Sequence, residues 1–239
     1  MKFRKPKIVL KMDAKDDLED CLGFIGHNFK ENPRYIRWFL PDDILHVFGP
    51  ATSLVILKKR LTEYVRGTYE RRHAEISENV RKADREWRSV EDKYFHLVNK
   101  IFKNHPWPKG PYVGAASIFM MYPRNIRNKT FFFPGIIYSE GTPPAATVIG
   151  HEVLHFMFFD YIEKRYGLKV GGRIKGKPKD YLWQISEVFN SVIESWGPYH
   201  RIFKFKTPPY VGKEFYASMR AQWMKDQDID RLLDKWLKM

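Results

Sequence analysis

The sequence contains one cysteine, Cys21, and no long apolar run. A single cysteine excludes an internal disulfide framework and fits a reducing compartment. No apolar stretch approaches the roughly 18 residues that a transmembrane helix needs. The first seven residues, Met-Lys-Phe-Arg-Lys-Pro-Lys, lack the apolar segment of a secretory signal. We therefore expect a cytoplasmic protein without a membrane-spanning segment.

Acidic residues are scarce, since 28 Asp and Glu stand against 42 Lys and Arg, a formal net charge of +14. Such a surplus favours a negatively charged partner or substrate. From Lys58 to Lys93 charges of both signs alternate, which is typical of a solvated helical surface. Two other segments, Lys164 to Lys179 and Arg201 to Lys213, contain no acid at all. They are consistent with solubility or weak RNA binding, and equally with a cleft that attracts acidic peptide segments or a terminal carboxylate.

One short motif combines residue types that bind a metal ion. The stretch from Ile149 to Phe156 reads Ile-Gly-His-Glu-Val-Leu-His-Phe. His151 and His155 are one helical turn apart, so both imidazoles can bind the same Zn²⁺ ion. Glu152 is rotated by about 100° from His151, and we expect it to take a proton from water at the open coordination position. This is the His-Glu-x-x-His arrangement of zinc metallopeptidases.

The surroundings of the motif predict a buried helix. Thr142 is a candidate N-cap followed by proline at the first helical position, and Gly167 is a candidate end. The residues between them leave almost no polar face, so the helix should run through a core. Two core histidines joined by hydrogen bonds are the alternative interpretation. A metal ion would satisfy both histidines and the carboxylate together.

The first part of the chain predicts a helical region over residues 1–105. We expect an edge strand at Lys7 to Met12, followed by a helix from Asp13 to Phe29 that Asp13 caps. The chain from Thr52 to Asn104 is predicted to be helical, with a bend or hairpin at Gly67. Its apolar stripe of period 3.5 indicates packing against a neighbouring helix.

The remaining residues, 106–239, are predicted to form a catalytic domain that begins with a small antiparallel or mixed sheet. Strands are expected at Tyr112 to Tyr122 and Thr130 to Tyr138, joined as a hairpin by Pro123 to Lys129. Pro134 interrupts the second strand and indicates a sheet edge, which can bind an extended substrate as a further strand. The residues assigned to this substrate edge are Phe132, Phe133, Ile136 and Ile137.

Three helices should follow an exposed basic loop at Lys169 to Lys179. The first is expected from Tyr181 to Trp196 with Asp180 as its cap, and the others at Gly212 to Lys225 and Asp228 to Lys238. The predicted fold class is therefore α+β, predominantly helical, with the small sheet before the metal-binding helix.

A hydrolytic zinc site usually has three protein ligands. Glu187, in the middle of the predicted helix Tyr181 to Trp196, is the best candidate for the third. Glu194 is the alternative, but it lies two turns along the same stripe, so both cannot bind one ion. Asp160 and Glu163 lie on the histidine helix itself at unfavourable angles.

With these residues the chain resembles the gluzincins, the thermolysin-like zinc metallopeptidases, and in size the minigluzincins. The resemblance covers about Tyr112 to Trp196. It implies a sheet whose edge strand binds substrate, an active-site helix, and a helical subdomain that brings the glutamate ligand. It also implies that Glu152 acts as general base and then as proton donor to the leaving amine.

The chain differs from the gluzincin pattern in the residues expected to support the site. Gluzincins commonly place an aspartate four residues after the glutamate ligand, where it bonds a ligand histidine, but this chain has Ser191 there and Asn190 one place earlier. We therefore assign the supporting role to Asn190 or Ser191. Family members also stabilise the oxyanion with His or Tyr, for which His200 is our first candidate, before Tyr199 and Tyr210.

The expected function is that of a cytoplasmic zinc metallopeptidase with a peptide or protein substrate, acidic in some segment. One alternative is a basic helical adaptor that binds RNA or acidic proteins, with a structural metal or none. Another is a latent or regulatory metalloprotein whose own helices plug the cleft. The sequence leaves the cleavage preference and the oligomeric state open.

Overall fold

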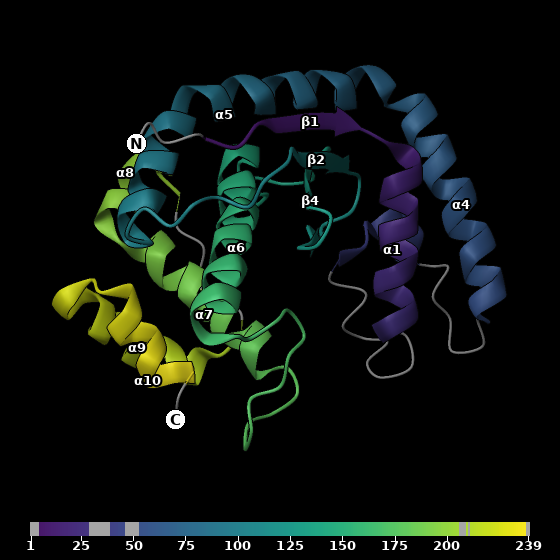
Figure 1. Cartoon of the computed structure of the whole chain (residues 1–239). Coiled ribbons are helices and arrows are strands. Elements are labelled where there is room, and N and C mark those ends of the chain that lie inside the picture. Colours follow the sequence, from purple (N-terminus) through teal and green to yellow (C-terminus); the bar gives the residue numbers. More distant parts are fainter. Residues whose placement is uncertain (1–4, 29–38, 46–52, 206–208, 210, 238–239) are drawn as a thin grey trace. The chain divides into compact units, whose positions relative to one another are not determined.

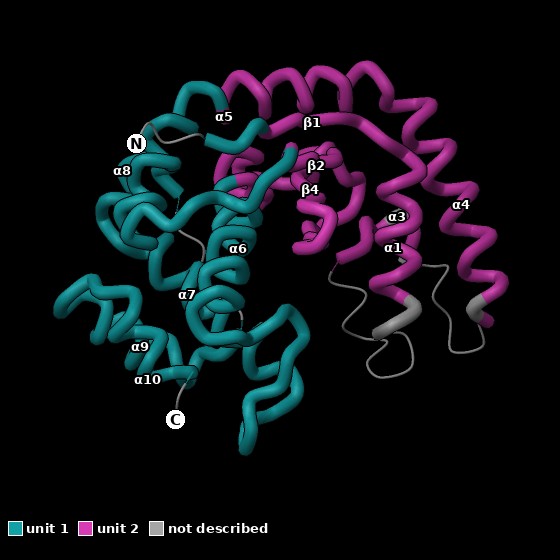
Figure 2. The backbone as a smooth tube through the Cα atoms, in the orientation of Figure 1, with its two compact units in different colours: residues 1–7, 88–110, 150–239 teal, residues 8–87, 111–149 magenta. Residues whose placement is uncertain are grey.

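The computed structural model describes residues 5–28, 39–45, 53–205, 209 and 211–237 (Figure 1). Two compact units make up the chain, unit 1 with residues 1–7, 88–110 and 150–239, and unit 2 with residues 8–87 and 111–149 (Figure 2). This division differs from the predicted boundary at residue 105, because two helices each pass from one unit to the other. No described helix is long and apolar enough to span a membrane.

Unit 2 contains a mixed sheet of four strands in the order β1-β2-β4-β3. The strands are β1 at Ile8–Met12, β2 at Tyr112–Ser117, β3 at Arg124–Asn125 and β4 at Thr130–Pro134. β1 is parallel to β2 and β2 is parallel to β4, whereas β3 is antiparallel to β4. The edge strand predicted at Lys7 to Met12 is confirmed as β1, and a small sheet does precede the histidine helix.

The predicted hairpin is wrong, because β2 and β4 run parallel. After Ser117 the chain leaves the sheet, and the backbone N–H of Ile118 donates to the Asp17 carboxylate instead of to a strand. It re-enters through β3 before it forms β4, which makes a tight β2–β4 turn impossible.

The prediction that the last strand forms a sheet edge is also wrong. β4 lies between β2 and β3, so Phe132 and Phe133 belong to an inner strand. The strand ends at Pro134, and Ile136 and Ile137 follow it. The argument that gave these four residues a role in substrate binding therefore no longer applies.

The described helices of unit 2 are α1 at Ala14–Asn28, α3 at Asp42–Leu45, α4 at Leu54–Arg71 and the first half of α5 at His73–Ile101. α1, α4 and α5 lie in the predicted helical ranges, whereas the short helix α3 was not predicted. The Asp13 carboxylate accepts the backbone N–H of Lys15 and of Asp16 at 3.1 Å, which confirms it as the cap of α1. The predicted break at Gly67 lies instead at Arg72, which leaves the helical conformation.

A buried carboxylate fastens α1 to α4 and to the sheet. Asp17 is 1% exposed and accepts hydrogen bonds from the Tyr69 hydroxyl and the Ile118 N–H, both at 2.9 Å. The Tyr69 hydroxyl also lies 2.8 Å from the carbonyl of Ala116 in β2. Burial raises the pKa of Asp17 to about 6, although hydrogen bonds from Ser117, Ile118 and Tyr69 act in the opposite direction.

Unit 1 holds the second half of α5 and most of α6, Ala145–Tyr166, together with four later helices. These are α7 at Tyr181–Ser195, α8 at Gly197–Phe203, α9 at Lys213–Asp226 and α10 at Ile229–Leu237. α7, α9 and α10 confirm the predicted helices to within one residue at every end that falls on described residues, whereas the predicted end at Lys238 lies outside them. α8 is an addition, because Gly197-Pro198 begins a helix here, with proline in its first turn.

The predicted ends of α6 and α7 are partly right. Gly167 has a φ of +69° and ends α6 as expected. α6 begins at Ala145, however, because the Thr142 hydroxyl accepts the N–H of Ser139 and so closes a turn before the helix. The carboxylate of Asp180 accepts the side-chain amide of Gln184 and makes no capping hydrogen bond to α7.

The buried Asp17 carboxylate predicts a pH-dependent stability. Its folded pKa of about 6 lies above the ordinary value of 3.8 for an aspartate, so the native state retains a proton that the unfolded chain loses. Its contribution is fully present below pH 4 and is lost as the pH rises through 6, about 3 kcal/mol in total. Urea unfolding should show the free-energy difference between wild type and Asp17→Asn changing by that amount between pH 4 and 7. Glu19→Gln, on the exposed side of α1, is the control, and a pH-independent difference for Asp17→Asn would contradict the account.

Candidate metal centre

Helix α6 brings two imidazoles to one point. His151 and His155 occupy successive turns, and their Nε2 atoms are 3.1 Å apart. The ring of His155 is fully buried and stacks on Phe159, while the side chain of His151 keeps 13% of its exposure. The predicted pair therefore shares one site with both Nε2 atoms directed to it.

Helix α7 supplies a carboxylate to the same point. The Oε2 atom of Glu187 lies 3.3 Å from Nε2 of His151 and 3.5 Å from Nε2 of His155. Farther along α7, Asn190 and Glu194 contact His151, so α7 runs antiparallel to α6. The ligand set predicted from the sequence, His151, His155 and Glu187, is thus the group of three that the structure brings together.

Aromatic packing holds α7 in this position. Phe189 on α7 packs against Phe158 on α6 with ring centroids 5.1 Å apart, and against Phe102 at 5.7 Å. Trp223 of α9 covers the other side of Phe189 at 6.5 Å. Every residue of α7 from Ile185 to Glu194 is buried, so the acids on it are held by a close-packed helix.

The three ligand atoms have the spacing that a zinc ion requires. Zinc binds nitrogen and carboxylate oxygen at roughly 2.0 to 2.2 Å, and in a tetrahedral site two such ligand atoms are about 3.3 Å apart. The observed separations of 3.1, 3.3 and 3.5 Å bracket this value. A point about 2 Å from all three atoms therefore exists, and the donor set fits the ion without rearrangement.

Glu194 orients the first histidine. Its Oε1 atom is 2.6 Å from Nδ1 of His151, which places the ring proton on Nδ1 and leaves the lone pair of Nε2 facing the ligand point. This support was expected from Asn190 or Ser191. Asn190 instead donates its amide to the backbone carbonyl of His151 at 2.9 Å, and Ser191 is buried in α7.

The supporting role of Glu194 was missed because we considered it only as a competing ligand. The signal was present in the sequence, since Glu187 and Glu194 are seven residues apart and so share one stripe of α7. Two acids on one stripe can meet the two nitrogens of one imidazole when the partner helix runs antiparallel. That direction could not be read from the sequence.

The electrostatics of the centre favour a cation. Three carboxylates are buried there, Glu152 at 4% exposure and Glu187 and Glu194 at 1% each. Burial lowers the pKa of the His151 imidazole, but the carboxylates of Glu194, Glu187 and Glu152 raise it by more, so that it stands well above its ordinary value. Negative potential that would retain a proton in this way also favours a divalent ion.

Glu152 lies next to the three candidate ligand residues but is not one of them. Its Oε1 atom is 3.9 Å from Nε2 of His151, farther than the distances among the three ligand atoms. The one-residue offset on α6 rotates its side chain by about 100° from that of His151, so it lies to one side of the two imidazoles. Its carboxylate can therefore exchange a proton with a molecule at the ligand point without binding the ion.

Tyr199 is a better candidate for stabilising the oxyanion than His200, which was the first candidate. The Nδ1 atom of His200 lies 3.3 Å from the carbonyl of Phe205, and no described contact joins it to the ligand set. The Tyr199 hydroxyl is fully buried and has no hydrogen-bond partner among the described residues. Burial raises its pKa well above the ordinary value, and the charges of Glu194 and Glu152 add to the shift. Tyr210 lies outside the described residues.

Gly150 explains how α8 reaches the centre. A Cβ atom at this position would lie 2.6 Å from the Phe203 ring and 2.9 Å from the Tyr199 hydroxyl. The carbonyl of Gly150 also accepts the Tyr94 hydroxyl at 2.8 Å. A glycine directly before His151 therefore lets the aromatic side chains of α8 pack on the backbone of α6.

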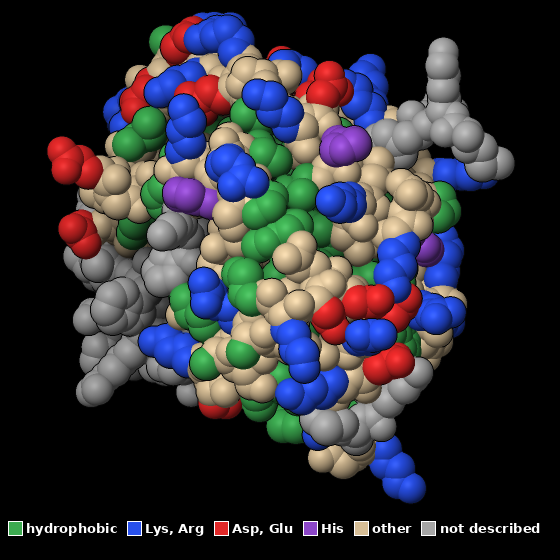
Figure 3. Space-filling model, turned by 90° about the vertical axis from the view of Figure 1, so that its left-hand side faces the viewer, with side chains coloured by type: hydrophobic (Ala, Val, Ile, Leu, Met, Phe, Trp, Pro, Cys, Tyr) green, Lys and Arg blue, Asp and Glu red, His purple; other side chains and the backbone are tan. Residues whose placement is uncertain are grey.

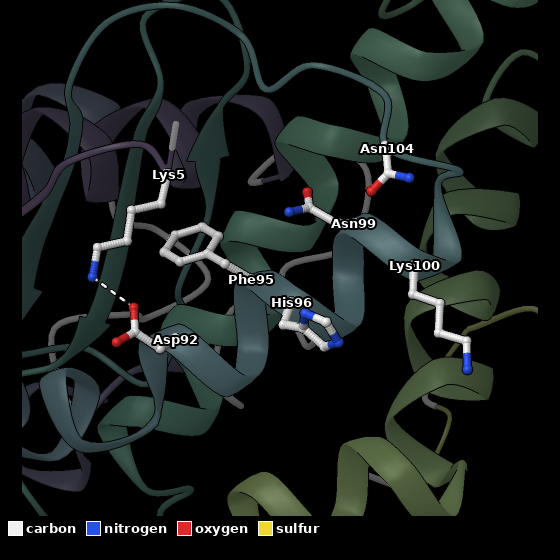
Figure 4. A pocket seen from close by; sticks show the side chains of 7 residues that line it. All are labelled: Lys5, Asp92, Phe95, His96, Asn99, Lys100 and Asn104. Carbon is white, nitrogen blue, oxygen red and sulfur yellow. Dashed lines mark hydrogen bonds and ion pairs between the residues drawn. The ribbon is translucent and has the colours of Figure 1, made fainter. Parts of the chain in front are cut away.

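A separate hollow of unit 1, of about 650 Å³, opens beside the C-terminal half of α5 (Figure 4). Of the lysines that line it, Lys5 forms ion pairs with Glu91 and Asp92 at 2.8 Å. None of the residues that line it belongs to the metal centre. They are Lys5, Asp92, Phe95, His96, Asn99, Lys100 and Asn104.

Comparisons with protein-family models, with curated proteins and with solved structures find no match for this chain. The assignment of its chemistry therefore depends on the geometry of the site.

The bond between Glu194 and His151 predicts how tightly the centre binds zinc. Supporting carboxylates of this kind typically change metal affinity by about 10- to 100-fold. Glu194→Gln should therefore weaken zinc binding by that factor in competition with a chromophoric chelator. Glu163→Gln, an exposed acid on α6, is the matched control, and equal affinities of the two variants would remove Glu194 from this role.

Proposed function

We propose that this protein is a zinc-dependent hydrolase. The observation that carries the proposal is the convergence of His151, His155 and Glu187, at 3.1 to 3.5 Å, with the carboxylate of Glu152 beside them. Three protein ligands are typical of catalytic zinc, which keeps one position for water or substrate, whereas structural zinc has four. The group found among the described residues has three.

Within that class we propose a metallopeptidase. The order His-Glu-x-x-His on one helix and a glutamate from a second helix are the features of the gluzincins that the chain resembles. When bound, zinc supplies a Lewis acid that polarises the substrate carbonyl and lowers the pKa of water.

Three residues of the chain then have separate roles in hydrolysis. Glu152, buried and close to the ligand point, accepts a proton from the attacking water and returns it to the leaving amine. Glu194 keeps His151 in the tautomer that presents Nε2. The Tyr199 hydroxyl stays protonated across the physiological range and is proposed to donate to the oxygen that gains charge.

The competing interpretations account for less of the site. Two core histidines in a hydrogen-bonded pair would not need three buried carboxylates around them, because each buried charge costs free energy when no cation balances it. A basic adaptor would not need them either. In the latent form the long helical region or the C-terminal helices would plug the cleft. Of the C-terminal helices, α9 packs on α7 instead, where Gly212 meets Val188 and Trp223 meets Phe189.

The role of Glu152 predicts a separation of binding from hydrolysis. Glu152→Gln should bind zinc with wild-type stoichiometry and unfold at the same temperature, but lose at least 100-fold in peptide hydrolysis, since general base catalysis contributes about 10² to 10⁴. Glu163→Gln should retain full activity. A peptide library with mass-spectrometric detection provides the assay, and wild-type rates in the Glu152→Gln protein would defeat the mechanism.

The positions of Tyr199 and His200 predict different effects on catalysis. Tyr199→Phe keeps the packed ring but removes the hydroxyl, and we expect kcat to fall by about 100-fold with KM nearly unchanged. His200→Gln should keep kcat within about threefold, because its ring faces the carbonyl of Phe205. The opposite ranking in steady-state kinetics would return the oxyanion role to His200.

A further inference from the structure

The loop between α6 and α7 carries a concentration of positive charge. Five cations of this loop, which we call the basic loop, form no ion pair with an acid of the described residues. Neighbouring cations do find partners, since Lys164 pairs with Asp160 and Arg165 with Asp230. The five are Lys169, Arg173, Lys175, Lys177 and Lys179.

Other parts of the described surface mix charges of both signs. On the face drawn in Figure 3, Lys and Arg side chains are scattered among Asp and Glu side chains. Cations on α5 likewise pair with acids one turn away, for example Arg88 with Glu91 and Arg81 with Glu78. The basic loop instead brings five cations together without an acid of the described residues paired to them.

The loop has a defined shape. Gly167, Gly171 and Gly176 all have positive φ values between 69° and 77°. The N–H of Gly172 donates to the carbonyl of Lys169, and a Cβ atom there would lie 2.7 Å from that oxygen. Lys177 lies 5.2 Å above the ring of Tyr181, which anchors the loop to the start of α7. Its cations are therefore presented from a turn with fixed glycine conformations.

The chain places the basic loop near the metal centre in unit 1. His155 precedes the last residue of α6, Tyr166, by 11 residues, and Glu187 follows the first residue of α7, Tyr181, by six. At 1.5 Å per helical residue these separations are about 16 and 9 Å. An extended peptide covers them in about three to five residues.

The chemistry of the loop favours carboxylates over nucleotides. Single-stranded nucleic acid sites combine cations with several aromatic rings on which bases stack. Residues 167 to 180 contain no aromatic residue. The ring of Tyr181 is buried beneath Lys177, and Trp183 is half exposed at 40%. The loop therefore lacks the stacking rings of a nucleic-acid site, which favours an acidic peptide as its partner.

We propose that the basic loop binds an acidic segment of the substrate polypeptide, about three to five residues from the bond at the metal centre. The proposal rests on the function proposed above for the catalytic role, but the binding itself needs neither metal nor hydrolysis. Substrates would then be polypeptides in which a run of Asp or Glu lies close to the cleaved bond.

The test uses the full-length Glu152→Gln protein and a fluorescein-labelled peptide with six consecutive glutamates. Anisotropy should show this peptide binding at least tenfold more tightly than its six-glutamine counterpart, with zinc and with EDTA. Neutralising the loop should remove at least tenfold of that affinity. The loop variant is K169Q/R173Q/K175Q/K177Q/K179Q.

A matched variant separates the loop from overall charge. It removes the same number of exposed cations from α4 and α5 of unit 2 and should change the affinity less than twofold. An equal loss in both variants, or no loss in the loop variant, would overturn the proposal, as would tighter loop-dependent binding of a charge-matched oligouridylate. The matched variant is K58Q/K59Q/R60Q/R66Q/K82Q.

Kinetics distinguish the two proposals. With otherwise wild-type protein and a cleaved substrate that carries the glutamates four residues away, the loop variant should raise KM at least tenfold and keep kcat within twofold. Loop-dependent peptide binding without hydrolysis of any peptide would support the binding site and overturn the peptidase. Hydrolysis with the same KM in the loop variant as in wild type would support the peptidase and overturn the binding site.

Discussion

The structure of unit 1 depends on the meeting of two imidazole nitrogens and one carboxylate oxygen in a buried space between α6 and α7. Each of these atoms presents electron pairs, and they lie 3.1 to 3.5 Å from one another. Such an arrangement is costly unless a cation or proton lies among them. The glutamate that holds Nδ1 of His151 adds to the requirement, because it directs another lone pair inward. A divalent ion would balance these charges with the geometry that the atoms already have.

The rest of unit 1 keeps this arrangement rigid. α7 is buried along most of its length, and Phe189 packs against Phe102, which follows α5, and against aromatic rings of α6 and α9. On the opposite end, Gly150 allows Tyr199 and Phe203 to pack on α6 next to the first histidine. A site built on close-packed helices holds its side chains more accurately than one built on loops. The basic loop between the same two helices is exposed, so its cations face solvent and are not buried in this core.

Local signals in the sequence predicted much of this. The spacing of His151 and His155, the amphipathic pattern around Glu187, the cap at Asp13 and the end at Gly167 each depend on a few neighbouring residues, and all agree with the structure. Predictions that depended on residues far apart in the sequence were wrong. The parallel pairing of β2 with β4 depends on β3 and on the bond between Ile118 and Asp17, which no local pattern reveals. The hydrogen bond of Glu194 to His151 requires α7 to run antiparallel to α6. α8 was not predicted, because Gly197-Pro198 can begin a new helix as well as end the preceding one.

The central claim is that the protein binds one zinc ion through His151, His155 and Glu187. Elemental mass spectrometry of the protein purified without chelators tests it most directly. The account predicts about one zinc per chain in the wild type, and a loss of most of it in His155→Ala and in Glu187→Ala, with Glu163→Ala unchanged. Wild-type protein without a stoichiometric transition metal, and unable to bind added zinc, would contradict it.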